Sequence, residues 1–336
     1  MKELARGGMG TVYEAEHVFL PRRAAVKVMH PELRKIPGMA TRAVQEASLL
    51  EDCPHPGTVR IFECNVLPDQ RPWIAMELVA GESLAARITR ERALSPIGVA
   101  AVIAAVADVL TTMHGKGVIH RDLKPDNLLL TPGSEFPLRV IDWGVARLGP
   151  AARLTMDDAS PGTPIYMSPE QARGTDIGAA CDIYSLGVIA YEALTGAPPF
   201  DGRTIAEVAC MHLTSEPAPL AKPGRPTELC TLIHRMLSKQ ASDRPTAAQV
   251  ARIASALADE LAGEYADLVI QDARPEDEEP IIEIVVEPVD THVATSPEHP
   301  HVIPRPRWTP NMGTLSSALS RQAPVAGEIV LLEKRR

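Results

Sequence analysis

The sequence predicts an α+β fold in which a small strand-rich part comes first, a mostly helical part follows and a tail ends the chain. The first 80 residues alternate short runs of strand-forming residues with turn residues. From Gly81 to about Leu261 the apolar residues recur mainly at helical intervals. A length of 336 residues fits one large two-lobed domain or a domain followed by a tail.

Strands and one helix account for the first part of the chain. β-branched and apolar residues favour strands at residues 11–16, 24–29, 58–64 and 73–78. The turns are Pro21-Arg22-Arg23, between the first two strands, and Pro68-Asp69, between the last two. Between the two pairs, residues 41–50 have helical spacing, with an apolar face that runs from Ala43 to Leu50.

The second part is predicted to form a helical lobe. Its longest apolar run, Ile97 to Leu110, predicts a buried core helix, because it carries Asp108 and is shorter than the roughly 18 residues of a membrane span. A short apolar strand is expected at Leu128 to Leu130. The predicted domain therefore covers residues 1–262, with an N-terminal lobe over about 1–79 and a C-terminal lobe over about 80–262. Residues 263–336 are acidic and proline-rich and are predicted to be a disordered tail.

The composition argues against several classes of partner. A formal net charge of −9 disfavours nucleic acid or an anionic membrane as a standing partner. Hydrophobic residues make up 45% of the chain but aromatic residues only 4%, so Ala, Leu and Val must do most of the packing. The five cysteines show no C-x-x-C spacing, which favours a reducing cytoplasm over a metal or disulfide framework. The first residues lack the apolar segment of a signal peptide.

The chemistry is carried by two motifs, His120-Arg121-Asp122-Leu123-Lys124-Pro125-Asp126-Asn127 and, fifteen residues beyond Asn127, Asp142-Trp143-Gly144. Asp122 is the candidate catalytic base, which orients a hydroxyl group and accepts its proton. Lys124 is the candidate cation that neutralises a moving phosphoryl group. Asn127 and Asp142 supply the hard oxygen atoms that Mg²⁺ prefers. Together these groups predict phosphoryl transfer.

In order and spacing, the two motifs resemble the catalytic loop and the metal-binding motif of eukaryotic-type bacterial serine/threonine protein kinases. The resemblance covers about residues 2–262 and implies a two-lobed protein-kinase-like fold with its cleft near Leu78 to Gly81. It implies ATP as the phosphate donor, Mg²⁺ or Mn²⁺ as the metal, and hydroxyl groups of proteins as acceptors. Lys124 together with Thr163 favours Ser/Thr over Tyr acceptors.

The resemblance also assigns the nucleotide side of the site. The segment from Arg6 to Val12 is similar to a glycine-rich loop, whose backbone N–H groups approach phosphate because no Cβ intervenes. Lys27 is expected to reach the α- and β-phosphates and to pair with Glu46. Met76 is expected to be the gatekeeper of a hinge whose backbone contacts adenine. The implied ATP-binding residues are Leu4, Gly7, Gly8, Gly10, Val12, Ala25, Lys27, Glu46, Met76, Glu77 and Val79.

The segment between Asp142 and Glu170 resembles an activation segment that ends in a substrate-docking part. Its candidate phosphorylation sites are Thr155, Ser160 and Thr163, with Thr155 as the first choice. Arg121 is expected to bind such a phosphate, since a planar guanidinium suits it. Glu170 is expected to form a buried pair with Arg244, and Asp182 to cap a helix and bond the backbone of the catalytic loop.

The chain departs from the family pattern at three positions. Ala5 stands where the first glycine of the loop is expected, and only four residues precede it, so the first strand is expected to be short. Trp143 replaces the usual Phe and is expected to pack against Leu50 and His120. Ser168 replaces Ala, which is expected to be a minor change.

These departures motivate an alternative function, a pseudokinase scaffold that binds nucleotide weakly or not at all. A small-molecule kinase is a third interpretation. Such enzymes share the fold but typically lack the arginine found here at Arg121 and the segment that ends at Glu170.

One segment of the tail has strand propensity, Ile281 to Glu287. It predicts either addition to the sheet edge of a partner protein or an adhesive stretch that the acidic run Glu276-Asp277-Glu278-Glu279 shields. The sequence leaves both interpretations open.

Overall fold

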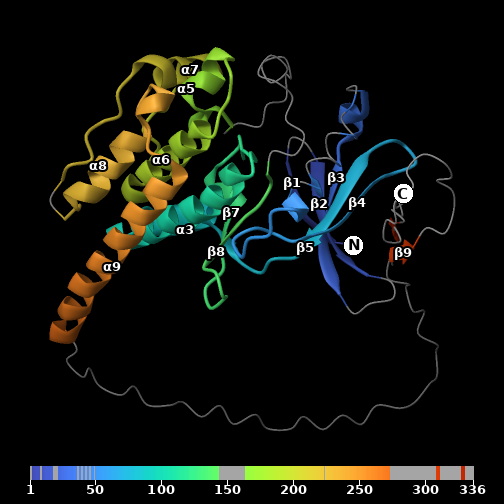
Figure 1. Cartoon of the computed structure of the whole chain (residues 1–336), viewed down its shortest axis with the longest axis horizontal. Coiled ribbons are helices and arrows are strands. Elements are labelled where there is room, and N and C mark those ends of the chain that lie inside the picture. The colour runs from blue at the N-terminus through green and yellow to red at the C-terminus, as the bar shows by residue number, and fades with distance from the viewer. Residues whose placement is uncertain are drawn as a thin grey trace, which may run out of the picture.

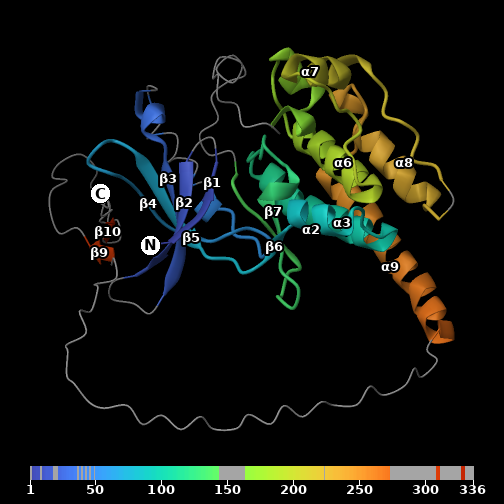
Figure 2. The same ribbon diagram turned by 180° about the vertical axis from the view of Figure 1, so that it is seen from behind.

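The computed structural model describes residues 2–7, 10–17, 22–35, 50–143, 163–222 and 224–272, with single residues between 38 and 48 and two short segments, 308–310 and 327–329. Within these ranges a sheet lobe and a helical lobe lie side by side, drawn in blue and in green to orange in Figure 1. Figure 2 shows the same division from behind. The predicted two-lobed α+β architecture is therefore confirmed.

The N-terminal lobe is built on an antiparallel sheet with the strand order β1-β2-β3-β5-β4. Its strands are β1 (Lys2–Arg6), β2 (Gly10–Glu16), β3 (Arg23–Met29), β4 (Ile61–Val66) and β5 (Pro72–Glu77). Val26 and Ala75 lie opposite each other in neighbouring strands and are fully buried in a small core on one face of the sheet. The four predicted strands agree with β2 to β5 to within three residues at each end.

The helix predicted at residues 41–50 is described only in part. A short 3₁₀ helix, η1 (Pro31–Lys35), precedes it. Ala47 and Leu50 are helical and buried, as an inward apolar face requires. Glu46 lies outside the described residues.

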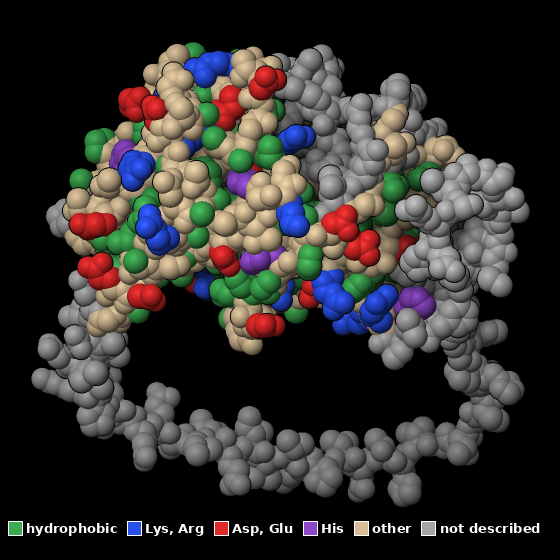
Figure 3. Space-filling view, in the orientation of Figure 1, with side chains coloured by type: hydrophobic (Ala, Val, Ile, Leu, Met, Phe, Trp, Pro, Cys, Tyr) green, Lys and Arg blue, Asp and Glu red, His purple; other side chains and the backbone are tan. Residues whose placement is uncertain are grey.

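Helices dominate the C-terminal lobe. They are α2 (Leu84–Glu91), α3 (Pro96–Gly115), α5 (Pro169–Arg173), α6 (Ala180–Thr195), α7 (Ile205–Thr214), α8 (Thr227–Met236) and α9 (Ala247–Asp272). A small sheet of the order β6-β7-β8 (Glu82–Ser83, Leu128–Leu130, Leu138–Val140) completes the lobe. The Val140 N–H donates to the Gly57 carbonyl at 2.7 Å, so this small sheet also joins the two lobes. On the face shown in Figure 3, acidic and basic side chains are interspersed over the helical lobe.

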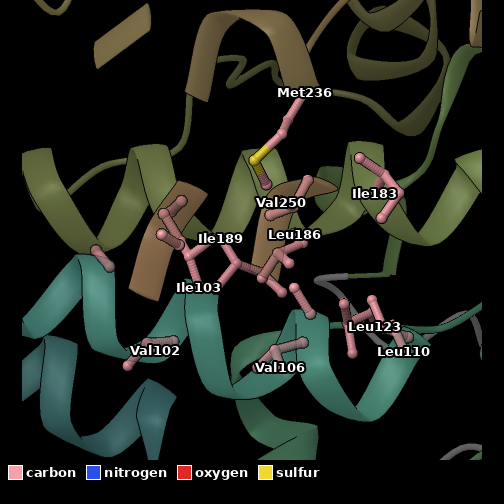
Figure 4. Packing of buried hydrophobic residues seen from close by; sticks show 14 of the residues in the cluster. Val102, Ile103, Val106, Leu110, Leu123, Ile183, Leu186, Ile189, Met236 and Val250 are labelled. Carbon is pink, nitrogen blue, oxygen red and sulfur yellow. The ribbon is translucent and has the colours of Figure 1, made fainter. Parts of the chain in front are cut away.

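Helix α3 is the central helix of the helical lobe. Ser95 caps its first turn by accepting from the Gly98 N–H, and Pro96 suits the first helical position because it has no N–H to leave unpaired. Ile103, Val106 and Leu110 are fully buried. In Figure 4, Ile103 lies beside Ile189 of α6, and Leu110 lies beside Leu123. By length and hydropathy alone α3 also meets the criterion for a membrane span, but more than half of it is buried against protein, as in the core helix of a globular domain.

Helix α9 ends at Asp272, ten residues beyond the predicted end of the domain at residue 262. Further along, β9 (Trp308–Pro310) and β10 (Gly327–Ile329) form an antiparallel pair. The segment from Ile281 to Glu287 and the acidic run before it lie outside the described residues.

Candidate active site

The catalytic loop joins the end of α3 to β7 and closes with the 3₁₀ helix η2 (Pro125–Asn127). Burial alternates along it. Leu123 and Pro125 are buried, whereas Asp122, just before Leu123, and Lys124, between the two, are partly accessible. The two candidate catalytic groups can therefore meet a ligand while their neighbours anchor the loop.

Buried polar groups hold the backbone on both sides of Asp122. The Asp122 N–H donates to His120 Nδ1 at 3.3 Å, and Asn127 Nδ2 donates to the Asp122 carbonyl at 2.9 Å. Because Nδ1 of His120 accepts, its Nε2 carries the proton and donates to the Ile141 carbonyl at 3.1 Å. The centroids of the Trp143 and His120 rings are 4.8 Å apart, which confirms the predicted contact between them, and Trp143 belongs to the same core cluster as Leu50.

Asp182, in the first turn of α6, binds the backbone of the catalytic loop through its carboxylate. Its carboxylate accepts from the N–H groups of His120 and Arg121, both at 2.8 Å, and lies 2.8 Å from His114 Nε2. Burial alone would raise the pKa of Asp182, but the hydrogen bonds from His114 and from the His120 backbone N–H outweigh burial, so its pKa lies below the ordinary value. The expected bond to the catalytic loop is present. The helix cap is not, because the N-cap residue is Ala179 and makes no side-chain bond.

Lys27 on β3 forms an ion pair with Asp142, with 2.5 Å between Nζ and Oδ1. The Lys27 side chain is 14% exposed and that of Asp142 39%. Burial raises the pKa of Asp142, but the Lys27 ammonium, with a smaller contribution from Lys124, lowers it by more, so the net shift is downward. The structure thus brings Lys27, Asp142 and Lys124 together, whereas the expected partner Glu46 lies outside the described residues.

The oxygen atoms of Asn127 and Asp142 fit a magnesium ion whose coordination shell is completed by phosphate and water. Asn127 commits its amide nitrogen to the Asp122 carbonyl, so its oxygen is left as the acceptor, and Asp142 offers a carboxylate. Mg²⁺ in nucleotide sites is usually held by one or two such oxygen groups and by phosphates. The described residues contain no cluster of three or more His, Cys, Asp or Glu side chains suited to a metal.

The predicted nucleotide side is assembled from adjacent strands. Val12 of β2 lies opposite Lys27 of β3, and Ala25 of β3 lies opposite Met76 of β5. The Glu77 N–H already donates to the Arg60 carbonyl at 2.9 Å, so any backbone bond from Glu77 to adenine must come from its carbonyl. Val79, the other hinge residue, is half-buried just after β5.

The glycine-rich loop is described at its two ends. The Gly7 N–H donates to the Gly10 carbonyl at 2.9 Å, while Gly8 lies outside the described residues. A Cβ at Gly10 would lie 2.4 Å from the Val28 carbonyl oxygen, so only glycine fits against β3 there. Leu4, on the edge strand β1, is 43% exposed. His30, which the sequence analysis did not single out, has its Nε2 2.7 Å from the Gly7 carbonyl.

Glu170 and Arg244 form the expected buried pair. Arg244 NH1 and NH2 donate to the two carboxylate oxygens of Glu170 at 2.7 and 2.9 Å. Arg244 also donates to the carbonyls of Ser238, Ala180 and Lys239. This fork ties α5 to α6 and to the segment before α9.

A model of the protein kinase domain matches residues 1–254. The chain belongs to this family. The chain is 38% identical over 266 residues to the serine/threonine-protein kinase pkn2 of Myxococcus xanthus, and the aligned region covers 77% of this chain and 32% of pkn2. It is 37% identical over 266 residues to PkaB of Streptomyces coelicolor, covering 77% of this chain and 63% of PkaB. The identity with PknA of Mycobacterium tuberculosis is 36%, over 72% of this chain and 56% of PknA. The chain thus spans from about a third to just under two thirds of the length of these relatives.

The end of the kinase activation segment is described from residue 163 onward. Thr163 begins the 3₁₀ helix η3 (Thr163–Tyr166), whereas Thr155 and Ser160 lie outside the described residues. Tyr166 donates from its hydroxyl to Glu192 Oε2 at 2.7 Å, and its carbonyl accepts from Ser185 Oγ at 2.7 Å. Both contacts fasten the docking end of the segment to α6.

Ser168 was expected to be only a minor change, and the sequence analysis did not single out Gln171. Ser168 Oγ accepts from the Gln171 N–H, and the Ser168 N–H donates to Gln171 Oε1, which makes a reciprocal cap on α5. Gln171 also donates from Nε2 to the Arg121 carbonyl at 2.8 Å. The pattern Ser168-Pro169-Glu170-Gln171 is the sequence signature of such a cap and would have identified it.

Proposed function

We propose that this kinase domain transfers the γ-phosphoryl group of Mg-ATP to Ser and Thr hydroxyls of proteins, including those of its own activation segment. The observation that carries the proposal is the convergence of Asp122, Lys124 and Asn127 on one fixed loop beside the Lys27–Asp142 pair. When bound, Mg-ATP supplies the phosphoryl group and the metal charge that such a reaction requires.

Each side chain has a separate task in the proposed reaction. Asp122 accepts a hydrogen bond from the acceptor hydroxyl and takes its proton. Lys124 offers its ammonium to negative charge on the transferred group, and Lys27 does the same for the α- and β-phosphates. Asn127 and Asp142 hold the metal through oxygen atoms, with Mg²⁺ preferred and Mn²⁺ as a substitute.

An assay with γ-labelled ATP and a generic basic protein substrate tests the proposal. Lys27→Ala should abolish most labelling, and Asp122→Asn should lower kcat about 10²–10⁴-fold because it removes the base. The matched controls Lys116→Ala and Asp201→Asn alter exposed residues of the same types and should label normally. Full activity in Asp122→Asn would rule out the base assignment. Wild-type protein that binds Mg-ATP but labels nothing would point instead to a non-catalytic scaffold.

The proposal extends to Ser/Thr preference and self-activation. Lys124 and the position of Thr163 at the docking end support Ser/Thr acceptors, and the exposed Arg121 offers a guanidinium for a phosphate on Thr155, Ser160 or Thr163. Mass spectrometry of active protein should find phosphate in this segment, with Thr155 as the first expectation. Active protein with an unmodified segment would contradict this part of the proposal.

We further propose that the domain acts in the cytoplasm on protein substrates, and that Ile281 to Glu287 adds as a strand to a partner's sheet edge. The strand propensity of that segment supports the second point. Replacing Ile284 by Pro, which cannot donate in a ladder, should weaken capture of partners by the full chain. Unchanged capture would favour the adhesive-stretch interpretation.

A further inference from the structure

The backbone of Arg121, immediately before Asp122, lies in the left-handed region with a φ of 61°. A non-glycine residue adopts this region only at a cost in free energy, so its surroundings must hold it there. If the contacts that hold the Arg121 backbone weaken, Arg121 relaxes toward a more favourable φ. This change rotates the peptide between Arg121 and Asp122 and moves the Asp122 carboxylate.

Two buried side chains hold the backbone polar groups of Arg121. Asp182 accepts from the Arg121 N–H at 2.8 Å, and Gln171 Nε2 donates to the Arg121 carbonyl at 2.8 Å. That carbonyl belongs to the same peptide unit as the Asp122 N–H, which donates to His120 Nδ1 at 3.3 Å. Gln171 and His120 therefore hold the two ends of the peptide that leads into the base.

The orientation of Gln171 is itself determined by its cap. Its Oε1 accepts from the Ser168 N–H at 3.0 Å, and a backbone N–H can only donate. The oxygen must therefore face Ser168 and the nitrogen must face Arg121. Ser168 is fully buried and Gln171 is 8% exposed, so water has little access to replace either bond.

We propose that Gln171 is a positioning residue for phosphoryl transfer. It joins the end of the activation segment to the catalytic loop and, through the Arg121–Asp122 peptide, sets where the Asp122 carboxylate meets the acceptor hydroxyl. The inference rests on the proposed function, because it gives Gln171 a part in that reaction. Its own bonds go to Ser168 and Arg121, so it acts through the backbone.

Gln171→Glu is a nearly isosteric test of this role. The substituted side chain can still accept from the Ser168 N–H, but while ionised it cannot donate to the Arg121 carbonyl. A carboxylate oxygen then faces the Arg121 carbonyl oxygen, and two acceptors repel each other. Misplacement of the base should lower kcat about 10-fold or more. The KM for ATP and the Kd for Mg-ATP should change less than about two-fold, since their contacts lie elsewhere.

A pH series distinguishes a lost donor from general damage. A protonated carboxyl group has an O–H that can donate to the Arg121 carbonyl. The ratio of Gln171→Glu to wild-type kcat should therefore rise as the pH falls from about 8 to about 6, because burial favours the protonated form. Gln171→Met cannot donate at any pH and should lose activity without this recovery.

The chain contains a matched control for the cap. Thr246 and Gln249 form the same reciprocal arrangement at the start of α9, with 2.9 Å from the Thr246 N–H to Gln249 Oε1 and 3.3 Å from the Gln249 N–H to Thr246 Oγ1. Gln249→Glu makes the same chemical change away from the catalytic loop. It should keep the wild-type kcat at every pH.

Initial rates over a range of ATP, a Mg-ATP titration and thermal unfolding of each variant decide the question. A wild-type kcat in folded Gln171→Glu would overturn the positioning role. A loss of kcat that Gln249→Glu shares would also overturn it, as would a loss that matches the unfolded fraction of Gln171→Glu. If Gln171→Glu does not fold, kcat of Gln171→Met at unchanged Kd for Mg-ATP decides instead. Wild-type protein without phosphotransfer would overturn the proposed function, and the positioning role with it.

Discussion

A single buried carboxylate, Asp182, orders the backbone of the catalytic loop. Asparagine at this position would keep the shape but would present an amide N–H₂ to one of the backbone donors of His120 and Arg121. Asp182→Asn should therefore lower the free energy of unfolding by about 1–3 kcal/mol, the cost of an unsatisfied buried donor. It should lower kcat about 100-fold, because the loop no longer holds the base in place.

Urea unfolding and initial rates measure both effects of Asp182→Asn. Asp176→Asn, in the exposed loop before α6, is the matched control and should change neither quantity. A variant with normal stability and activity would show that the loop keeps its conformation without the Asp182 charge.

Glu192 predicts a pH dependence of stability. Burial raises its pKa, the hydrogen bond from Tyr166 opposes the shift, and the Asp126 carboxylate adds to it, with a net upward direction. A carboxyl group with a raised folded pKa adds stability that is fully present below its unfolded pKa of about 4.3 and is lost as the pH rises through the folded value. Glu192→Gln stays neutral and can still accept from Tyr166. It should therefore gain stability over the wild type as the pH rises from about 4 to about 7.

The gain in Glu192→Gln should stay below about 1 kcal/mol, because Glu192 is only half-buried and solvent screens its charge. Urea unfolding of both proteins across this pH range measures it. A difference that does not vary with pH would contradict the assigned direction.

Among the elements, α5 is tied to α6 and to the segment before α9 through one buried ion pair. Arg244→Met leaves the buried Glu170 carboxylate without its fork and should cost about 3–5 kcal/mol of unfolding free energy. The double variant Glu170→Leu with Arg244→Met removes both charges and should recover part of that loss. Chemical denaturation measures both, with the exposed Arg235→Met as control. A double variant no more stable than Arg244→Met would contradict the argument.

Element types were more predictable from the sequence than element ends. Runs of β-branched and apolar residues between turns located β2 to β5, and the apolar run from Ile97 to Leu110 located α3. Helix α3 continues to Gly115 because Met113 is fully buried beyond two threonines that interrupt the apolar run. The short β6 could not be predicted, because a pair of residues carries no periodicity and takes its conformation from its neighbour β7.

At the scale of the whole molecule, the motifs predicted which residues belong to the site but not how they pair. Lys27 and Asp142 are 115 positions apart, and their ion pair forms only because β3 and the segment after β8 come together across the two lobes. The spacing of residues within a motif cannot predict a contact between residues so far apart in the sequence. The resemblance to kinases assigned Lys27 to phosphates and to Glu46, and the pair with Asp142 was not foreseen. The reciprocal cap and its bond to Arg121 were also missed, although the cap itself had a local signature.

The Lys27–Asp142 pair makes nucleotide binding and the joining of the lobes interdependent. A ligand that binds only the folded protein raises its stability by about 2.7 kcal/mol at 100 times its Kd. For a domain of this size that corresponds to a rise in Tm of about 5 °C or more.

Asp142→Asn removes both the partner of Lys27 and a carboxylate suited to Mg²⁺. We therefore expect a lower Tm without ligand and a smaller rise with Mg-ATP than in the wild type, whereas ATP with EDTA should shift both proteins equally. Differential scanning fluorimetry of both proteins without ligand, with Mg-ATP and with ATP and EDTA measures these shifts, with Asp201→Asn as the control. An undiminished Mg-ATP shift in Asp142→Asn would mean that the metal takes its protein oxygens from elsewhere.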